Sequence, residues 1–117
     1  MSPLKPSKQA KHLYGIYLMS KQKQQNKTEA KQRLLCWTDK SWGDLQYWYK
    51  QNQDKYETII DLLDECRRNP FKGKGKPEPL KGNLTGYWSR RIDREHRLVY
   101  LPEDGHIYVV SCRYHYE

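Results

Sequence analysis

The segment Lys76-Pro77-Glu78-Pro79 places one carboxylate on a stiff stretch of chain within a group of lysines. Each proline fixes its own backbone φ and biases the residue before it towards an extended conformation. The lysines in this stretch are Lys72, Lys74, Lys76 and Lys81. Lys74 and Lys76 would attract RNA phosphates, while the Glu78 carboxylate would act as a general base on a 2′-hydroxyl. The same residues also fit a solvated glutamate in a turn.

Three arginines follow on what we predict to be successive strands. Arg90, Arg91 and Arg97 are separated by a short connection that contains Asp93 and Glu95. Guanidinium groups at these positions could clamp a phosphate and stabilise the extra charge of a pentavalent transition state. The alternative is that they form surface ion pairs with the two acids.

The C-terminal residues add an acid to this set. The unperturbed pKa of a histidine lies near neutral, which suits His115 to donate a proton to a leaving 5′-oxygen. Tyr116 could stack on a base. Strand alternation leaves the direction of His115 open, because Val109 and Val110 are both apolar. Together with Glu78 and the arginines, these side chains fit metal-independent RNA cleavage, in which the 2′-hydroxyl attacks the adjacent phosphate.

The elements that must position these groups follow from periodicity and turn signals. We predict strands over 33–37, 87–92, 97–101 and 107–115 and helices over 42–49 and 56–66. Thr38 or Ser41 caps the first helix, with Ser41-x-x-Asp44 as a capping box, and residues 51–54 break it. Residues 72–82 form a loop, and Asp104-Gly105 closes a hairpin. The order β-α-α-β-β-β predicts an α+β fold with two helices packed on one face of a mostly antiparallel sheet.

Composition limits the class of protein. The chain has 117 residues, a net charge of +8 and a mean hydropathy of −1.13, yet 13% of its residues are aromatic. It has neither a membrane-spanning run nor a secretory signal, so we expect a cytoplasmic protein without membrane contact. The odd number of cysteines (Cys36, Cys66 and Cys112) and their wide spacing favour buried thiols over disulfides or zinc. We expect no metal and no cofactor.

The positive charge is concentrated in residues 1–34 and 67–100. We interpret residues 1–32 as a basic, disordered N-terminal extension and residues 33–117 as the folded domain. The extension could add nonspecific attraction to RNA. The alternatives are a solvated tail or an incorrect start site.

The segment PFKGKGKPEPLKGNLTGYWSRRIDREHRLVY, together with the terminal CRYHY, resembles the YoeB/Txe toxins of bacterial type II toxin–antitoxin systems. The resemblance extends from about Arg33 to Tyr116. It implies a RelE-like microbial ribonuclease fold and ribosome-dependent cleavage of mRNA in the A site of the 70S ribosome. It also implies a homodimer and a cognate YefM-like antitoxin whose C-terminal segment occupies the active site.

The resemblance also implies roles for individual residues. It makes Glu78 the general base, His115 the general acid and Arg97 the arginine of the transition state. Tyr116 takes the place of the terminal tyrosine of the family. Arg91 and Glu95 match further active-site positions.

Glu117 departs from the family pattern, which ends at the tyrosine. Its carboxylate would favour the protonated form of His115 or repel RNA phosphate. The competing functional hypothesis is a non-catalytic translation inhibitor that binds the ribosome or RNA through the basic region. Binding alone needs no general base or acid, so the combination of Glu78, Arg97 and His115 favours the enzyme.

Overall fold

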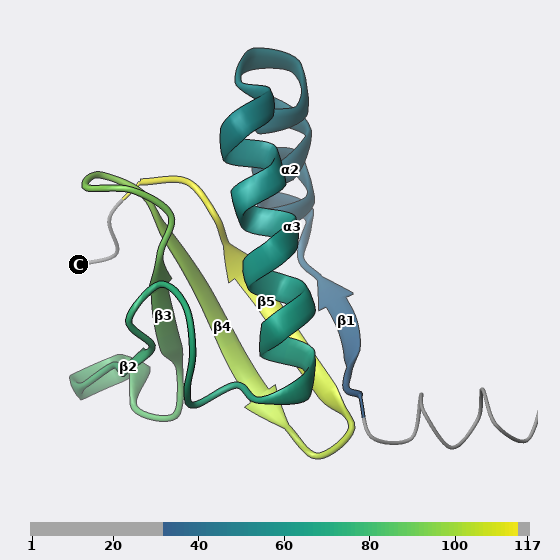
Figure 1. Cartoon of the computed structure of the whole chain (residues 1–117). Coiled ribbons are helices and arrows are strands. Elements are labelled where there is room, and N and C mark those ends of the chain that lie inside the picture. The colour runs from purple at the N-terminus through teal and green to yellow at the C-terminus, as the bar shows by residue number, and fades with distance from the viewer. Residues whose placement is uncertain (1–31, 115–117) are drawn as a thin grey trace, which may run out of the picture. The chain divides into compact units, whose positions relative to one another are not determined.

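A computed structural model describes residues 32–114 as one sheet with two helices packed on it (Figure 1). In chain order the elements are β1 (Leu34–Trp37), α2 (Asp39–Gln51), α3 (Gln53–Arg68), β2 (Glu78–Pro79), the 3-10 turn η1 (Gly82–Leu84), β3 (Trp88–Arg91), β4 (Arg97–Glu103) and β5 (His106–Ser111). The strands lie in the order β1-β5-β4-β3-β2. β1 is parallel to β5, and the other pairs are antiparallel. The predicted α+β class is confirmed, and β2 is an additional strand.

Several predictions concern residues outside the described part of the chain. These are residues 1–31 of the N-terminal extension and, at the other end, His115, Tyr116 and Glu117. The division into an extension and a folded domain therefore stays a prediction. Within residues 32–114, no helix has the length and apolar character needed to cross a membrane.

The capping of α2 confirms one of the two predicted caps. Thr38 Oγ1 accepts a hydrogen bond from the Ser41 N–H at 3.0 Å, and Ser41 Oγ accepts one from the Thr38 N–H at 2.9 Å. This reciprocal pair is a capping box with serine in the position usually held by glutamate. The predicted box of Ser41 with Asp44 is wrong. Asp44 is buried and accepts a hydrogen bond from the backbone N–H of Cys112 instead.

Asn52 separates the two helices. Its N–H donates to the Trp48 carbonyl at 2.8 Å at the end of α2, and its side chain accepts from the Lys55 N–H at 3.2 Å at the start of α3. One residue with extended backbone thus serves as the cap of both helices. The predicted break over 51–54 is confirmed and is confined to this residue.

The strands differ from prediction at two places. The predicted loop 72–82 contains β2 and ends at the first residue of η1. A two-residue strand ending in proline has no alternation that a sequence pattern could reveal. β5 ends at Ser111, before the predicted end at 115. Val99 pairs with Ser111 while Tyr100 pairs with Val109, so β5 carries an extra residue at this point. This bulge explains the two consecutive valines that obscured the alternation.

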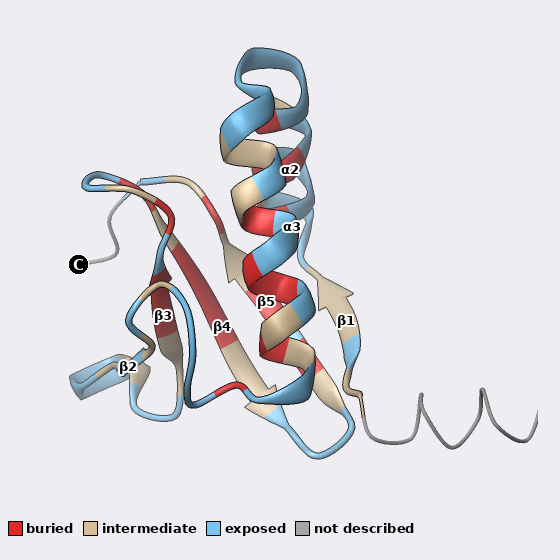
Figure 2. Ribbon diagram, viewed as in Figure 1, coloured by how far each residue is buried: buried red, intermediate tan, exposed pale blue. Residues whose placement is uncertain are grey.

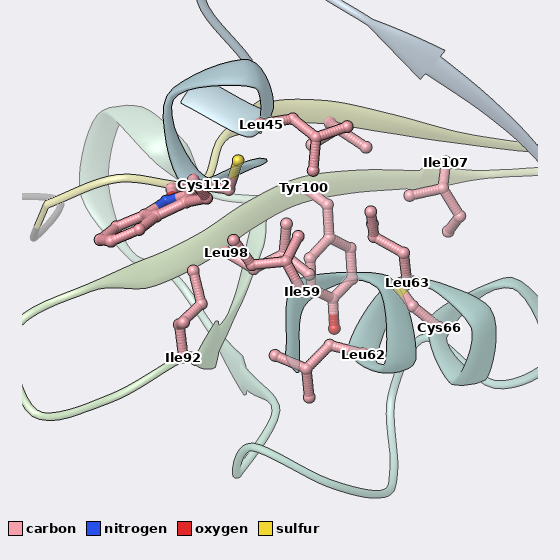
Figure 3. Close-up of a cluster of buried hydrophobic side chains, with 12 residues drawn as sticks. Leu45, Ile59, Leu62, Leu63, Cys66, Ile92, Leu98, Tyr100, Ile107 and Cys112 are labelled. Carbon is pink, nitrogen blue, oxygen red and sulfur yellow. The ribbon is translucent and has the colours of Figure 1, made fainter. Parts of the chain in front are cut away.

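The core lies between the sheet and the helices (Figures 2 and 3). Its buried members are Leu45, Trp48, Ile59, Leu62, Leu63, Cys66, Ile92, Leu98, Tyr100, Ile107, Val109 and Cys112. Burial raises the pKa of Cys66 to about 11 and that of Cys112 to about 12, so both are neutral thiols. The expectation of buried thiols is confirmed for these two, whereas Cys36 is only half-buried.

Arg90 is also part of this core, with none of its side chain exposed. Its five guanidinium N–H groups donate to the Tyr100 hydroxyl, the Glu65 carboxylate and the backbone carbonyls of Asn69, Lys72 and Lys74. The donor–acceptor distances run from 2.7 Å to Asn69 to 3.2 Å to Tyr100. A buried cation is tolerated when all its donors are satisfied. The prediction that Arg90 clamps a phosphate is therefore wrong, because the protein occupies every donor.

Replacement of Arg90 by lysine should lower the free energy of unfolding by about 3 kcal/mol, because an ammonium group offers three donors to five buried acceptors. Arg91→Lys is the matched control on the exposed side of the same strand and should change it by less than about 0.5 kcal/mol. Urea unfolding followed by tryptophan fluorescence measures both. Equal midpoints for the two variants would contradict the structural role of Arg90.

Stability should also depend on pH through Glu65. The hydrogen bond from the Arg90 side chain lowers the pKa of Glu65 in the folded state. A depressed carboxyl pKa contributes stability that is present above the unfolded pKa, about 4.3, and is lost as the pH falls through the folded value. The gap in unfolding free energy between wild type and Glu65→Gln should therefore shrink below about pH 4. A gap that stays constant from neutral to acid pH would contradict this.

Candidate active site

The strand register places Glu78, Arg91 and Arg97 on one face of the sheet. Glu78 pairs with Ser89, and Arg91, two residues further along β3, pairs with Arg97. Paired residues point to the same side of a sheet, and so do residues two apart in one strand. Arg90, which lies between Ser89 and Arg91, points to the helix side. The three predicted site residues therefore share the face opposite the helices.

Glu78 is exposed on the edge strand β2. The strand continues the pairing through the Leu80 N–H, which donates to the Tyr87 carbonyl at 2.8 Å. The prediction of a carboxylate on a fixed backbone is thus supported by pairing as well as by the flanking prolines. The alternative was a solvated glutamate in a turn. The side chain does face solvent, but Glu78 lies in a strand and not in a turn.

Two glycines bring the loop before β2 close to the core. A Cβ on Gly73 would lie 1.4 Å from Glu65 Oε1, and one on Gly75 would lie 3.0 Å from the Arg91 carbonyl oxygen. Both have positive φ, which side chains rarely adopt. The Arg91 N–H donates to the Gly75 carbonyl at 2.6 Å, which fixes this loop to β3.

The loop presents Lys74 and Lys76 to solvent on either side of Gly75. The Lys74 N–H donates to Glu65 Oε1 at 2.7 Å, which anchors its backbone. Lys76 has φ +50, a left-handed conformation that is unfavourable for a residue with a side chain. The prediction of cations beside Glu78 agrees with this placement, and their role in binding RNA stays a prediction.

Arg97 is held by the turn between β3 and β4. Its Nη1 donates to the carbonyls of Asp93 at 2.6 Å and His96 at 3.0 Å. The Asp93 carboxylate accepts the backbone N–H groups of Glu95 and His96 and pairs with Lys55 Nζ at 3.2 Å. The alternative of ion pairs between the arginines and these acids is therefore wrong for Arg97 and Asp93. Within residues 32–114, Nη1 alone holds this guanidinium group.

The chain after β5 is anchored at two points. The Cys112 N–H donates to Asp44 Oδ2 at 3.1 Å, and Trp48 Nε1 donates to the Cys112 carbonyl at 2.7 Å. At Tyr114, the N–H donates to His96 Nδ1 at 2.7 Å, and the carbonyl accepts from the Arg97 N–H at 3.1 Å. The described chain thus ends beside Arg97, one residue before His115. His115 and Tyr116 themselves lie outside the described residues.

The residues that anchor this segment were missed by the sequence prediction. Asp44, Trp48 and His96 bond partners that are 68, 64 and 18 residues away along the chain. No local pattern marks such pairs. Within residues 32–114, no group of three His, Cys, Asp or Glu side chains is placed to hold a metal ion.

Residues 37–116 match the family model described as the YoeB-like toxin of bacterial type II toxin-antitoxin system. The chain belongs to the YoeB toxin family. It is 51% identical over 82 residues to the toxin YoeB of Escherichia coli K12, an alignment that covers 70% of this chain and 98% of that toxin. Toxin YoeB of Synechocystis is 51% identical over 84 residues, covering 71% of this chain and 96% of its own length. The predicted resemblance is confirmed.

Solved structures confirm the toxin fold. The YoeB/ParE toxin from Agrobacterium tumefaciens matches with a TM-score of 0.68 and 47% identity, covering 71% of this chain and 99% of its own. A YoeB dimer from Staphylococcus aureus matches with a TM-score of 0.68 and 43% identity, covering 73% and 99%. Escherichia coli YafQ, at 19% identity and a TM-score of 0.56, shares the fold alone.

Lys76→Gly should separate stability from RNA binding. Glycine removes the strain of the left-handed conformation, which costs a residue with a side chain about 1–2 kcal/mol. Glycine also lowers stability by about 0.5–1 kcal/mol, because it has more conformational entropy in the unfolded chain. The unfolding free energy should therefore stay equal or rise, while affinity for RNA falls with the lost cation.

The matched control is Lys72→Gly, which makes the same change in the same loop where φ is not positive. This variant should be destabilised by about 0.5–1 kcal/mol. Thermal unfolding compares the two, and a larger loss for Lys76→Gly would show that its backbone is not strained.

Proposed function

We propose that this YoeB-family toxin is a ribosome-dependent endoribonuclease that cleaves mRNA in the ribosomal A site by metal-independent acid–base chemistry. The observation that carries the proposal is the shared sheet face of Glu78, Arg91 and Arg97, with the C-terminal segment fixed beside Arg97. A base, phosphate-binding cations and a terminal acid can meet one phosphodiester from this face.

The reaction begins when Glu78 removes the proton of a ribose 2′-hydroxyl. The oxygen then forms a bond to the adjacent phosphorus, and Arg97 stabilises the charge of the pentavalent transition state. The bond from phosphorus to the 5′-oxygen breaks as His115 donates a proton to that oxygen. The products are a 2′,3′-cyclic phosphate and a free 5′-hydroxyl.

The remaining residues of the site bind and orient the RNA. Lys74, Lys76 and Arg91 are exposed cations and would hold the backbone phosphates. Glu95 is exposed at the β3–β4 turn, where a carboxylate oxygen lies 3.6 Å from His96 Nε2. Tyr116 would stack on a base next to the cleaved bond.

The partners follow from the family. The structures from Staphylococcus aureus include a YoeB dimer at 43% identity and YoeB–YefM toxin–antitoxin complexes at 45–46% identity. We therefore propose that this chain forms a homodimer in the cytoplasm and is inhibited there by a YefM-like antitoxin. Its targets when released are mRNA and the 70S ribosome.

A non-catalytic inhibitor that only binds the ribosome is the competing function. The basic loop and exposed arginines would serve it equally well. It does not explain why an acidic side chain projects from the strand next to the cationic loop, where it would repel RNA phosphate. A general base accounts for that placement.

The test maps mRNA 5′ ends after purified protein is added to translating ribosomes. Wild type should create new ends within the A-site codon. Glu78→Gln and His115→Gln should each reduce cleavage by about 10²–10⁴-fold, because each loses one proton-transfer step.

Matched controls make the same changes at the far end of the β4–β5 hairpin. Glu103→Gln and His106→Gln, a pair across the two strands, should cleave like wild type. If wild type and both site variants block translation equally and no new 5′ ends form, the nuclease hypothesis is wrong and the protein is a ribosome-binding inhibitor.

A further inference from the structure

His96 lies where the C-terminal segment meets the start of β4. It is 9% exposed, and its ring packs edge-on against Trp48 with centroids 4.7 Å apart. Its Nδ1 accepts the Tyr114 N–H at 2.7 Å. The next residue, Arg97, donates its own N–H to the Tyr114 carbonyl at 3.1 Å. Both backbone groups of Tyr114 are therefore held by two consecutive residues.

Tyr114 needs to be held, because its φ is +69. A tyrosine in this left-handed region is strained and keeps the conformation only when surrounding contacts impose it. The conformation turns the chain immediately before His115. Loss of either hydrogen bond would let Tyr114 return to an ordinary extended or helical backbone.

The bond to Tyr114 also defines the chemical form of the imidazole ring. An acceptor at Nδ1 requires a lone pair there, so the ring proton of a neutral histidine is on Nε2. Nε2 lies 3.6 Å from a carboxylate oxygen of Glu95, which favours a proton on that nitrogen. The ring therefore presents an acceptor to Tyr114 and a donor towards Glu95.

We propose that His96 is a positioning residue for the cleavage reaction, which holds the Tyr114 backbone against Arg97 so that the following His115 can reach the scissile phosphate. This role rests on the proposed function. His96 touches no substrate in this account and acts through His115 alone. A shift of the acid by about 1 Å can reduce a rate by about 10²-fold, so an anchor of this kind matters to kcat.

Two amide variants separate the anchor from simple packing. The side-chain oxygen of His96→Asn can take the position of Nδ1 and accept the Tyr114 N–H. The amide of His96→Gln reaches the position of Nε2 and leaves Nδ1 without a substitute. A merely structural histidine would not distinguish the two, since both remove the same aromatic ring from Trp48. His106→Gln, far from this segment, is the control for loss of an imidazole.

The rate measurement is single-turnover cleavage of mRNA on programmed ribosomes, with ribosome affinity and thermal midpoint measured for the same proteins. His96→Gln should lose about 10²-fold in rate at unchanged ribosome affinity. His96→Asn should retain most of the wild-type rate. Equal rates for the two variants, or a loss of ribosome affinity that accounts for the change in rate, would overturn the inference.

A second measurement needs no ribosome. In the isotopically labelled full chain, a scalar coupling across the hydrogen bond should link the Tyr114 amide nitrogen to His96 Nδ1. Absence of that coupling in folded wild type overturns the inference while leaving the proposed function untouched. Failure of wild type to cleave overturns the proposed function, and the role of His96 with it.

Discussion

The structure depends on one buried cation. The five hydrogen bonds of Arg90 tie the end of α3 and the loop behind it to the middle strands of the sheet. Three of the acceptors are backbone carbonyls in residues 69–74. The guanidinium group therefore satisfies the backbone of that loop, as pairing with a strand otherwise would. Because side chains alternate along β3, the residues before and after Arg90 point to the opposite face. One strand therefore holds the loop with one face and builds the candidate site with the other.

The edge strand β2 is short, yet it is enough to fix the backbone of Glu78. β2 is two residues long, and its Pro79 offers no N–H to a further strand. Short edge strands rich in proline and flanked by lysine also resist pairing with other chains. Glu78 is thus exposed to solvent on a backbone that is fixed by pairing with β3 and by the proline on either side of it. Rigidity here comes from covalent and pairing constraints, and it needs no burial of the carboxylate.

The sequence predicted most of this fold because most of its signals are local. Both helices, the longer strands and the turn at Asp104-Gly105 follow from periodicity and turn residues. The role of Arg90 could not be predicted, since its acceptors are carbonyls and side chains 10–25 residues away. Glu78 and the arginines were candidates from residue type and setting, and the family resemblance then assigned roles to Glu78 and Arg97 and matched Arg91 to the predicted site. Their common face follows only from the pairing register of the strands. The bulge in β5 interrupts the alternation of side chains, so the sequence did not show in which direction the C-terminal residues face.

The chain after that bulge is directed by contacts from other elements. Glu78, Ser89, Val99 and Ser111 form one row across β2, β3, β4 and β5. Neighbouring strands are about 4.8 Å apart, so β5 runs roughly 14 Å from β2, the strand that carries Glu78. Beyond Ser111 the chain stays beside β4, because the Tyr114 carbonyl accepts the N–H of Arg97, the first residue of that strand, at 3.1 Å. Asp44 and Trp48 of α2 bond the backbone of Cys112, and His96 bonds that of Tyr114, so a helix and the β3–β4 turn together fix the backbone that leads to His115, the general acid of the proposed reaction.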